Sequence, residues 1–114
     1  MSISRAILVT GAATGVGAAV VRRMAAPGTA ILAHTRGNAE HLATVAAEAR
    51  AKGSDVAEAL GDLARPETAA ELVDTAIARF GRLDVMVANA GFADRTQTAD
   101  LTDAVDRPGA ERFR

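Results

Sequence analysis

Three closely spaced glycines carry the clearest chemical signal in this sequence. Gly11, Gly15 and Gly17 lie in the stretch TGAATGVG, directly after a short apolar run. Glycine has no Cβ, so the backbone of such a turn can approach a ligand closely. A helix that begins inside the turn directs its first N–H groups, and the positive end of its dipole, at an anion. The spacing therefore predicts a turn that holds a pyrophosphate group.

Apolar runs and helical patterns alternate along the chain on both sides of this turn. Strands are expected at 5–10, 29–34, 56–60 and 83–88, where short apolar runs end in glycine or polar residues. Helices are expected to begin near Gly15, after Asn38 as N-cap, and at Pro66. This alternation predicts an α/β fold with one parallel sheet and right-handed crossovers.

The expected helices differ in how clearly they mark their buried faces. The first repeats Val16, Val20 and Met24 every four residues, which predicts an inward-facing stripe. The third carries the strongest apolar stripe of the chain, over 72–80 with Ile77 included, and it is expected to belong entirely to the core.

Two further motifs follow the glycine-rich turn. Asp62 follows the third expected strand in the triplet GDL, and the segment FGRLDVMVANAG occupies 80–91. With TGxxxGxG, these motifs resemble the N-terminal half of the short-chain dehydrogenase/reductase family over about 5–91, with Ala88 in place of the first Asn of its NNAG motif. The resemblance implies a Rossmann-type parallel sheet of strand order 3-2-1-4 in a truncated three-layer α/β/α arrangement.

The resemblance also divides the chain and implies a cofactor site. It makes 1–91 an NAD(P)-binding Rossmann half-domain and 92–114 an irregular or short-helical tail that diverges from the family. In the family, the Asp after the third strand bonds the adenine amino group, and the Asn of NNAG stabilises the central sheet beside the cofactor. The residues expected to bind the cofactor, or to lie beside it, are Gly11, Thr14, Gly15, Val16, Gly17, Thr35, Arg36, Asp62, Leu63, Asn89, Ala90 and Gly91.

The end of the second expected strand bears on the choice of cofactor. NAD-preferring dinucleotide folds place a carboxylate about 20 residues after the glycine motif, where it binds the ribose 2′-hydroxyl. Here that stretch reads AHTR, without a carboxylate, and Arg36 offers a charged fork that suits a phosphate. We therefore expect NADP(H) to be preferred, with NAD(H) as an alternative. Arg36 stacked on adenine or facing solvent, and Asp62 as a simple turn residue, are the competing interpretations.

Other residues that could do chemistry receive structural interpretations. His34 and His41 lack a third ligand or an orienting carboxylate, so both are expected to be surface or loop histidines, and no metal site is expected. The family's proton donor is a Tyr with a Lys four residues later, helped by a Ser and an Asn, all beyond NNAG. This chain has no tyrosine, and its single lysine, Lys52, ends the second expected helix. No catalytic residue is assigned, and the 114-residue chain alone is expected to be inactive.

Composition and the resemblance together define the expected function. A net charge of −1 with dispersed arginines argues against nucleic acid and membrane partners, and the absence of a signal peptide pattern predicts a cytoplasmic protein. The resemblance implies the NADP(H)-binding part of an oxidoreductase that, at full length, reduces a small carbonyl or oxidises the matching alcohol. The alternatives are a non-catalytic NADP-binding or partner-docking module and an inert truncated product. The exposed edge of the fourth strand would allow self-association.

Overall fold

Strands and helices alternate strictly in the computed structural model, which describes residues 2–89. The strands are β1 (Arg5–Val9), β2 (Thr29–Thr35), β3 (Asp55–Leu60) and β4 (Val85–Val87), and the helices are α1 (Gly15–Met24), α2 (Ala39–Ala51) and α3 (Pro66–Phe80). Each expected strand is present within two residues of its predicted ends. The expected features of the tail beyond residue 89 lie outside the described residues.

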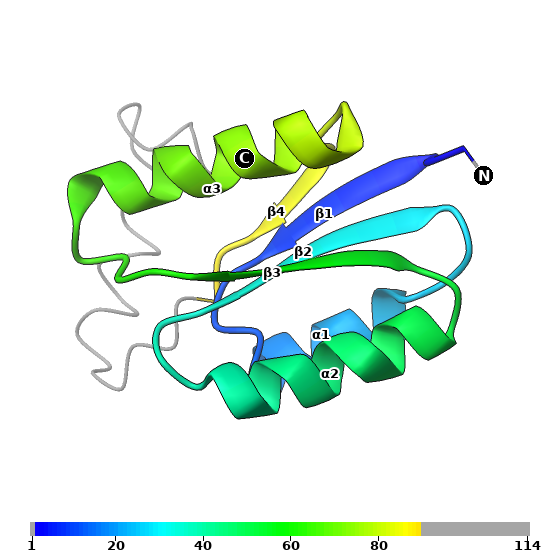
Figure 1. Cartoon of the computed structure of the whole chain (residues 1–114), viewed down its shortest axis with the longest axis horizontal. Helices are drawn as coiled ribbons and strands as arrows, with labels where there is room; N and C mark the ends of the chain where they lie inside the picture. The colour runs from blue at the N-terminus through cyan, green and yellow to red at the C-terminus, as the bar shows by residue number, and fades with distance from the viewer. Residues whose placement is uncertain (1, 90–114) are drawn as a thin grey trace.

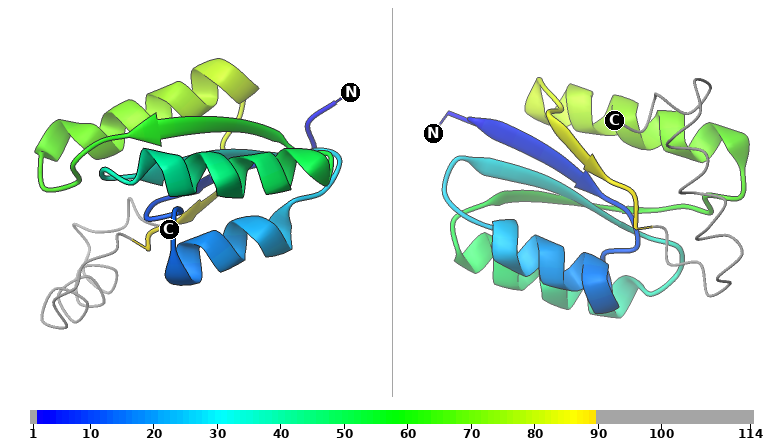
Figure 2. Two further views of the ribbon diagram at one scale, coloured as in Figure 1. Left: turned by 60° about the horizontal axis from the view of Figure 1, so that its bottom comes forward. Right: turned by 180° about the vertical axis from the view of Figure 1, so that it is seen from behind.

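The four strands form one parallel sheet in the order β3-β2-β1-β4, as expected. In the central pair, Ile7 lies beside Ile31 and Leu8 beside Leu32. The sheet separates α3 on one face from α1 and α2 on the other (Figure 1), and the view from behind shows the same layers (Figure 2). All carboxyl ends of the strands therefore meet at one edge, where the β1–α1, β2–α2 and β3–α3 loops lie together.

Alternation of side chains along β1 and β2 builds a separate apolar core on each face of the sheet. One core packs β-strand residues against α1 and α2, and its largest buried members are Ile7, Val9, Val21, Ile31, Leu42, Val45 and Val56. The other packs the opposite face against α3 and contains Ala6, Leu8, Ala30, Leu32, Leu72, Ala76 and Phe80. β1 and β2 are thus buried on both sides, which explains their continuously apolar sequences.

Two residues of the expected helical stripes are exposed, which corrects those predictions. Val16 is 67% exposed and Ile77 48% exposed. In α3 the buried face follows a spacing of four through Thr68, Leu72, Ala76 and Phe80, so Ile77 is rotated about 100° away from the sheet. In α1 the buried face instead contains Gly17, Ala18 and Val21, which leaves Val16 on the open side of the first turn.

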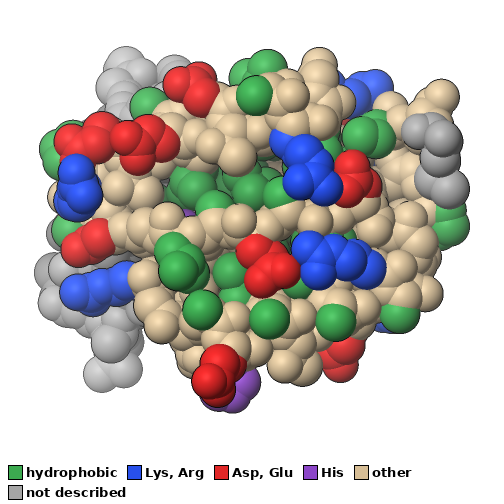
Figure 3. Space-filling model, in the orientation of Figure 1, with side chains coloured by type: hydrophobic (Ala, Val, Ile, Leu, Met, Phe, Trp, Pro, Cys, Tyr) green, Lys and Arg blue, Asp and Glu red, His purple; other side chains and the backbone are tan. Residues whose placement is uncertain are grey.

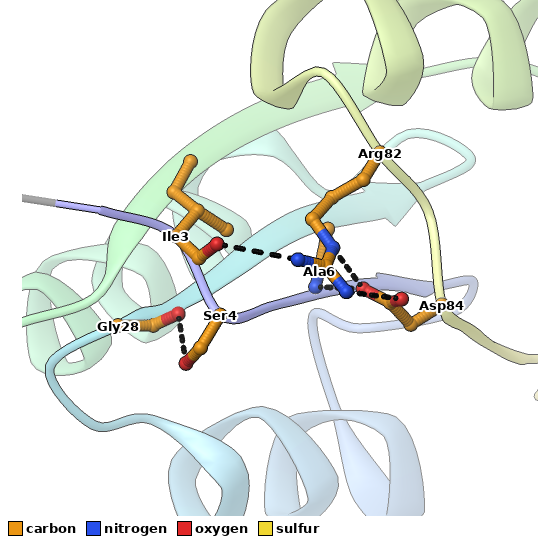
Figure 4. A network of polar contacts seen from close by, with 6 residues as sticks. All are labelled: Ile3, Ser4, Ala6, Gly28, Arg82 and Asp84. Carbon is orange, nitrogen blue, oxygen red and sulfur yellow. Dashed lines mark hydrogen bonds and ion pairs between the residues drawn. The ribbon is translucent and has the colours of Figure 1, made fainter.

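The amino end of the sheet is tied together by Asp84 (Figure 4). One carboxylate oxygen, Oδ2, accepts hydrogen bonds from the backbone N–H of Ala6 at 2.8 Å and from Arg82 Nε at 2.8 Å, while Oδ1 accepts from Arg82 Nη2 at 2.9 Å. The side-chain hydrogen bonds from Arg82, followed by the one from Ala6, lower the pKa of Asp84 below its usual value. The backbone N–H of Asp84 in turn donates to the carbonyl of Ala6 at 2.9 Å, and the register of β4 on β1 follows directly, with Val85 beside Ile7.

The outer edge of β3 carries a shallow groove of about 390 Å³ between α2 and α3 (Figure 3). Two ion pairs line it and join β3 to the helices, Arg50 of α2 with Glu58 at 3.1 Å and Arg79 of α3 with Asp55 at 2.9 Å. Arg50 also donates from Nη2 to the carbonyl of Val56 at 2.9 Å. These charged side chains protect the strand edge from pairing with another chain.

Candidate functional site

The glycine-rich turn adopts backbone conformations and close contacts that its glycines permit. Gly11 and Gly15 have φ angles of +63° and +61°, in the left-handed region that L side chains rarely adopt. A Cβ on Gly17 would lie 2.1 Å from the carbonyl oxygen of Gly11 and 3.0 Å from the side-chain nitrogen of Asn89. Gly17 is therefore needed for the first turn of α1 to pack directly on the end of β1.

The open side of the same turn suits an anion. α1 begins at Gly15, with Thr14 as an N-cap residue of extended backbone and no acidic residue in the first turn. Helix geometry leaves the N–H groups of Thr14, Gly15, Val16 and Gly17 without intrahelical partners. Among residues 2–89, no atom beyond its chain neighbours and its own helix backbone lies within 4 Å of the position a Cβ on Gly15 would take. The turn thus combines free donors, a helix dipole and open space, which is what a pyrophosphate requires.

The ends of β2 and β3 bring two of the predicted site residues together. Arg36 follows β2 with its side chain 82% exposed, and its Nη2 lies 4.0 Å from Oδ2 of Asp62 in the β3–α3 loop. Thr35 is buried at the end of β2, and its carbonyl accepts a hydrogen bond from Gly61 N–H at 3.2 Å. A positive and a negative side chain therefore stand side by side at the carboxyl edge of the sheet.

Asp62 also stabilises a turn, which is the role that the sequence offered as the alternative to cofactor binding. Its Oδ1 accepts a hydrogen bond from the backbone N–H of Ala64 at 2.9 Å, and its carbonyl accepts one from Arg65 at 3.0 Å. The other carboxylate oxygen remains directed at Arg36. The turn fixes the carboxylate in place and leaves Oδ2 for another partner. Leu63, the next residue, packs half-buried on the core beneath α3.

The predicted site residues form two groups at this edge. The first joins Gly11 and Gly17 to Asn89, whose own N–H bonds the carbonyl of Val87 at 3.1 Å. The exposed residues Thr14, Gly15 and Val16 continue this group along the turn. The second group consists of Arg36, Asp62 and their loop neighbours. Ala90 and Gly91 lie outside the described residues.

His34 connects the two groups, and its prediction as a surface or loop histidine is wrong. It lies in β2 and is only 1% exposed. Its Nδ1 accepts a hydrogen bond from Gly11 N–H at 3.3 Å, and its Nε2 donates to the carbonyl of Gly61 at 2.8 Å. The sequence held a signal for this burial, because His34 follows the apolar run AILA of a central strand. A central strand of a parallel sheet is buried on both faces, and every residue of β2 is buried.

The other residues that could do chemistry lie elsewhere. His41 is exposed on α2, as expected, and its Nδ1 donates to Oδ1 of Asn38 at 2.8 Å, so the Asn38 side chain makes no N-cap bond. Lys52 donates from Nζ to the carbonyl of Arg22 at 2.7 Å, beyond the C-terminus of α2 at the amino end of the sheet.

Among residues 2–89, no three His, Cys, Asp or Glu side chains are grouped to hold a metal ion. No helix in this part of the chain has the length and apolar character to cross a membrane.

Comparison with known proteins agrees with this geometry. The short chain dehydrogenase family matches residues 5–107, further along the chain than the motif-based resemblance reached. The short chain dehydrogenase/reductase nsrJ of Aspergillus novofumigatus is 36% identical over 96 residues, which cover 84% of this chain and 36% of that protein. L-rhamnose 1-dehydrogenase (NAD(P)(+)) of a Sphingomonas species is 37% identical over 107 residues, which cover 90% of this chain and 41% of that protein.

A solved structure gives the same result at the level of the fold. A metagenomic short-chain oxidoreductase crystallised with NADP superposes with a TM-score of 0.71 at 32% identity, covering 80% of this chain and 41% of that one. This chain spans about two fifths of the length of the curated relatives described above, 36% of one and 41% of the other. The fold, the motifs and the matched range together show that the chain belongs to the short-chain dehydrogenase family.

Proposed function

We propose that this chain is the NADP(H)-binding part of a short-chain oxidoreductase. The observation that carries the proposal is the carboxyl edge of the sheet, which carries both a glycine-rich turn without acidic residues in the first turn of α1 and the exposed guanidinium of Arg36. One end of this edge suits a pyrophosphate and the other a 2′-phosphate. The complete protein would act on a small carbonyl compound or the matching alcohol.

Each group of residues has a defined part in this proposal. The turn from Gly11 to Gly17 would hold the pyrophosphate with its backbone N–H groups, and exposed Val16 would pack against the cofactor. Arg36, next to Thr35, would bind the 2′-phosphate. Asp62 and Leu63 would border the adenine, while Asn89, Ala90 and Gly91 would lie beside the rest of the dinucleotide. The bound nicotinamide supplies or accepts the hydride.

The proposed preference for NADP(H) rests on the charge and exposure of Arg36. Its side chain is 82% exposed, and the pair with Asp62 at 4.0 Å is at the outer limit of an ion pair. Such an exposed pair contributes about 1 kcal/mol or less, so a phosphate dianion can compete for the guanidinium. One solved relative is bound to NADP and one curated relative is named for NAD(P)(+), so both support the binding of a nicotinamide dinucleotide.

The chain offers no proton donor of the kind the family uses. It contains no tyrosine, and Lys52 lies at the amino end of the sheet, far from the glycine-rich turn. We therefore propose that the 114-residue chain binds the cofactor without turning over substrate. The same observation favours a non-catalytic NADP-binding module as the second candidate function.

Titration of the purified chain with NADPH and with NADH tests the first proposal. The fluorescence of the reduced nicotinamide reports binding, and NADPH is expected to bind more tightly. A parallel assay of NADPH oxidation with a panel of small aldehydes and ketones is expected to show no turnover. A folded chain that binds neither dinucleotide contradicts the cofactor site, while measurable turnover contradicts the absence of catalysis.

The edge of β4 provides a surface for self-association. In the described part of the chain β4 pairs only with β1, and Val85 on this strand is 38% exposed. We propose that two copies pair along this edge, because an apolar strand edge with free backbone groups favours strand addition. Sedimentation velocity on the wild type and on Val85→Lys tests this. The wild type should show a concentration-dependent dimer that the variant loses, and a wild-type monomer at every concentration contradicts the proposal.

A further inference from the structure

His34 holds two loops of the carboxyl edge through opposite sides of one imidazole ring. Its Nδ1 accepts from Gly11 N–H in the glycine-rich turn, at 3.3 Å, and its Nε2 donates to the carbonyl of Gly61, just before Asp62, at 2.8 Å. The residues it joins are 23 and 27 positions away in sequence. No part of the proposed function described above uses this buried, polar side chain.

These two bonds define one tautomer of the ring. A backbone N–H can only donate, so Nδ1 must carry a lone pair toward Gly11, and a carbonyl can only accept, so Nε2 must carry the proton. The ring is therefore neutral with its hydrogen on Nε2. A proton on Nδ1 would oppose the N–H of Gly11 inside a buried site, at the cost of the bond that orders the turn.

The backbone around His34 reinforces the same two connections. The carbonyl of His34 accepts from Ala12 N–H at 2.7 Å, and the carbonyl of Thr35 accepts from Gly61 N–H at 3.2 Å. Each loop is thus anchored once to the backbone of β2 and once to the imidazole. On the turn side, the carbonyl of Gly11 also lies so close to Gly17 that only a hydrogen fits there. A shift of the ring would therefore be transmitted to the first turn of α1.

We propose that His34 is a positioning residue that sets the spacing between the glycine-rich turn and the loop of Asp62. The inference rests on the proposed cofactor function, because a ligand that spans both loops gains from having them preorganised. Adenosine 2′,5′-bisphosphate is such a ligand, since its 5′-phosphate would lie at the turn and its adenine and 2′-phosphate near Asp62 and Arg36. His34 itself touches no part of the ligand in this arrangement.

Two conservative substitutions each remove one of the two His34 hydrogen bonds and retain the other. The side-chain oxygen of Asn matches the position of the histidine Nδ1, so His34→Asn retains an acceptor for Gly11 and loses the donor to Gly61. The amide nitrogen of Gln matches Nε2, so His34→Gln retains the donor to Gly61 and loses the acceptor. His34→Ala removes both. His41→Ala is the matched control, because His41 is exposed on α2 and bonds only Asn38 among the residues described.

The affinity for adenosine 2′,5′-bisphosphate, measured by calorimetry on the full chain well below the melting temperature, is the first readout. His34→Asn and His34→Gln should each weaken binding about fivefold, and His34→Ala more than tenfold, as expected for losing one or two ordering hydrogen bonds. His41→Ala should bind like the wild type. A folded His34→Ala variant with wild-type affinity overturns the proposal, because a purely structural role changes the melting temperature alone.

The second measurement is made on the wild-type chain, so it does not depend on whether a variant folds. Imidazole ¹⁵N chemical shifts of the wild-type chain should show the Nε2–H tautomer for His34, and they should move when the bisphosphate binds, while those of His41 stay unchanged. Slow amide exchange of Gly11 should accompany this tautomer. An Nδ1–H tautomer or a rapidly exchanging Gly11 overturns the link between the loops. If the wild type shows the tautomer but binds neither NADPH nor the bisphosphate, the cofactor proposal fails, and the positioning role fails with it while the loop link stands.

Discussion

Arg36 and Asp62 meet across the carboxyl ends of β2 and β3, with Nη2 of the guanidinium 4.0 Å from Oδ2 of the carboxylate. Their side chains are 82% and 41% exposed, so water screens the attraction and the pair holds Arg36 only weakly. The carboxylate keeps Arg36 near the edge of the sheet and also repels a second anion. The balance between these two effects determines how strongly this edge selects a 2′-phosphate.

Replacing Arg36 by Ala should weaken NADPH binding selectively. A charge-assisted contact to phosphate contributes about 1.5 to 3 kcal/mol, so NADPH affinity should fall at least tenfold while NADH affinity changes less than about twofold. Fluorescence titration with both dinucleotides measures this. The control is Arg22→Ala, which removes a surface arginine of α1 paired with Glu48 of α2 at 2.8 Å. Equal losses for NADPH and NADH would contradict 2′-phosphate recognition by Arg36.

The neighbouring substitution Asp62→Asn should shift the cofactor ratio in the opposite direction. Asn retains an oxygen for the N–H of Ala64, so the turn is preserved, but the charge facing Arg36 is lost. The ratio of NADPH to NADH affinity should rise about two- to fivefold, in keeping with the small energy of an exposed pair. Asp62→Ala serves as the comparison, since it also removes the turn bond and should lower the melting temperature. An unchanged ratio in Asp62→Asn would separate Asp62 from phosphate selection.

Gly17→Ala should damage both the fold and the cofactor site. The added methyl group would lie 2.1 Å from the carbonyl oxygen of Gly11, where neither backbone segment can move freely. We expect a loss of about 2 kcal/mol or more in the free energy of unfolding, together with loss of NADPH binding. Gly37→Ala is the matched control, because in the described part of the chain no atom beyond its two chain neighbours lies within 4 Å of the added Cβ. Urea unfolding of both variants tests the prediction. An unfolding midpoint of Gly17→Ala equal to that of Gly37→Ala would contradict it.

The Asp84 network predicts a stability that falls in acid. The folded-state pKa of Asp84 is lowered by the Arg82 side chain and then by the Ala6 N–H. A lowered folded pKa means that the stabilisation is complete above the unfolded pKa of about 3.9 and is lost as the pH falls through the folded value. Thermal melts of the wild type should therefore show a drop in melting temperature below about pH 4.

Asp84→Asn isolates this contribution. The variant should melt at a lower temperature than the wild type at neutral pH, and the difference should shrink in acid, where Asp84 is itself protonated. Asp74→Asn, on the exposed face of α3, is the control for removing one carboxylate. A constant difference between Asp84→Asn and wild type from neutral pH to about pH 2.5 would show that the charge of Asp84 is not what stabilises the fold.

The sequence was sufficient for the features that depend on local patterns. The order of strands follows from the alternation of elements and the family motifs, and the positions of Gly11, Gly15 and Pro66 follow from local rules of turns and helix starts. The core of β1 and β2 was also predictable, because a strand covered by helices on both faces must be apolar throughout. Apart from the strand order, which the family resemblance implies, these features need only information from residues a few positions apart.

Only the tertiary structure decided which residues of these patterns meet. The apolar periodicity of each helix predicted Val16 and Ile77 to be core residues, but the rotation of each helix on the sheet leaves them exposed. His34 read as a loop residue, yet the parallel pairing of β2 between β1 and β3 brought Gly11 and Gly61 to opposite sides of its ring. Contacts between residues more than 20 positions apart depend on strand register and helix docking, which periodicity along one segment does not encode.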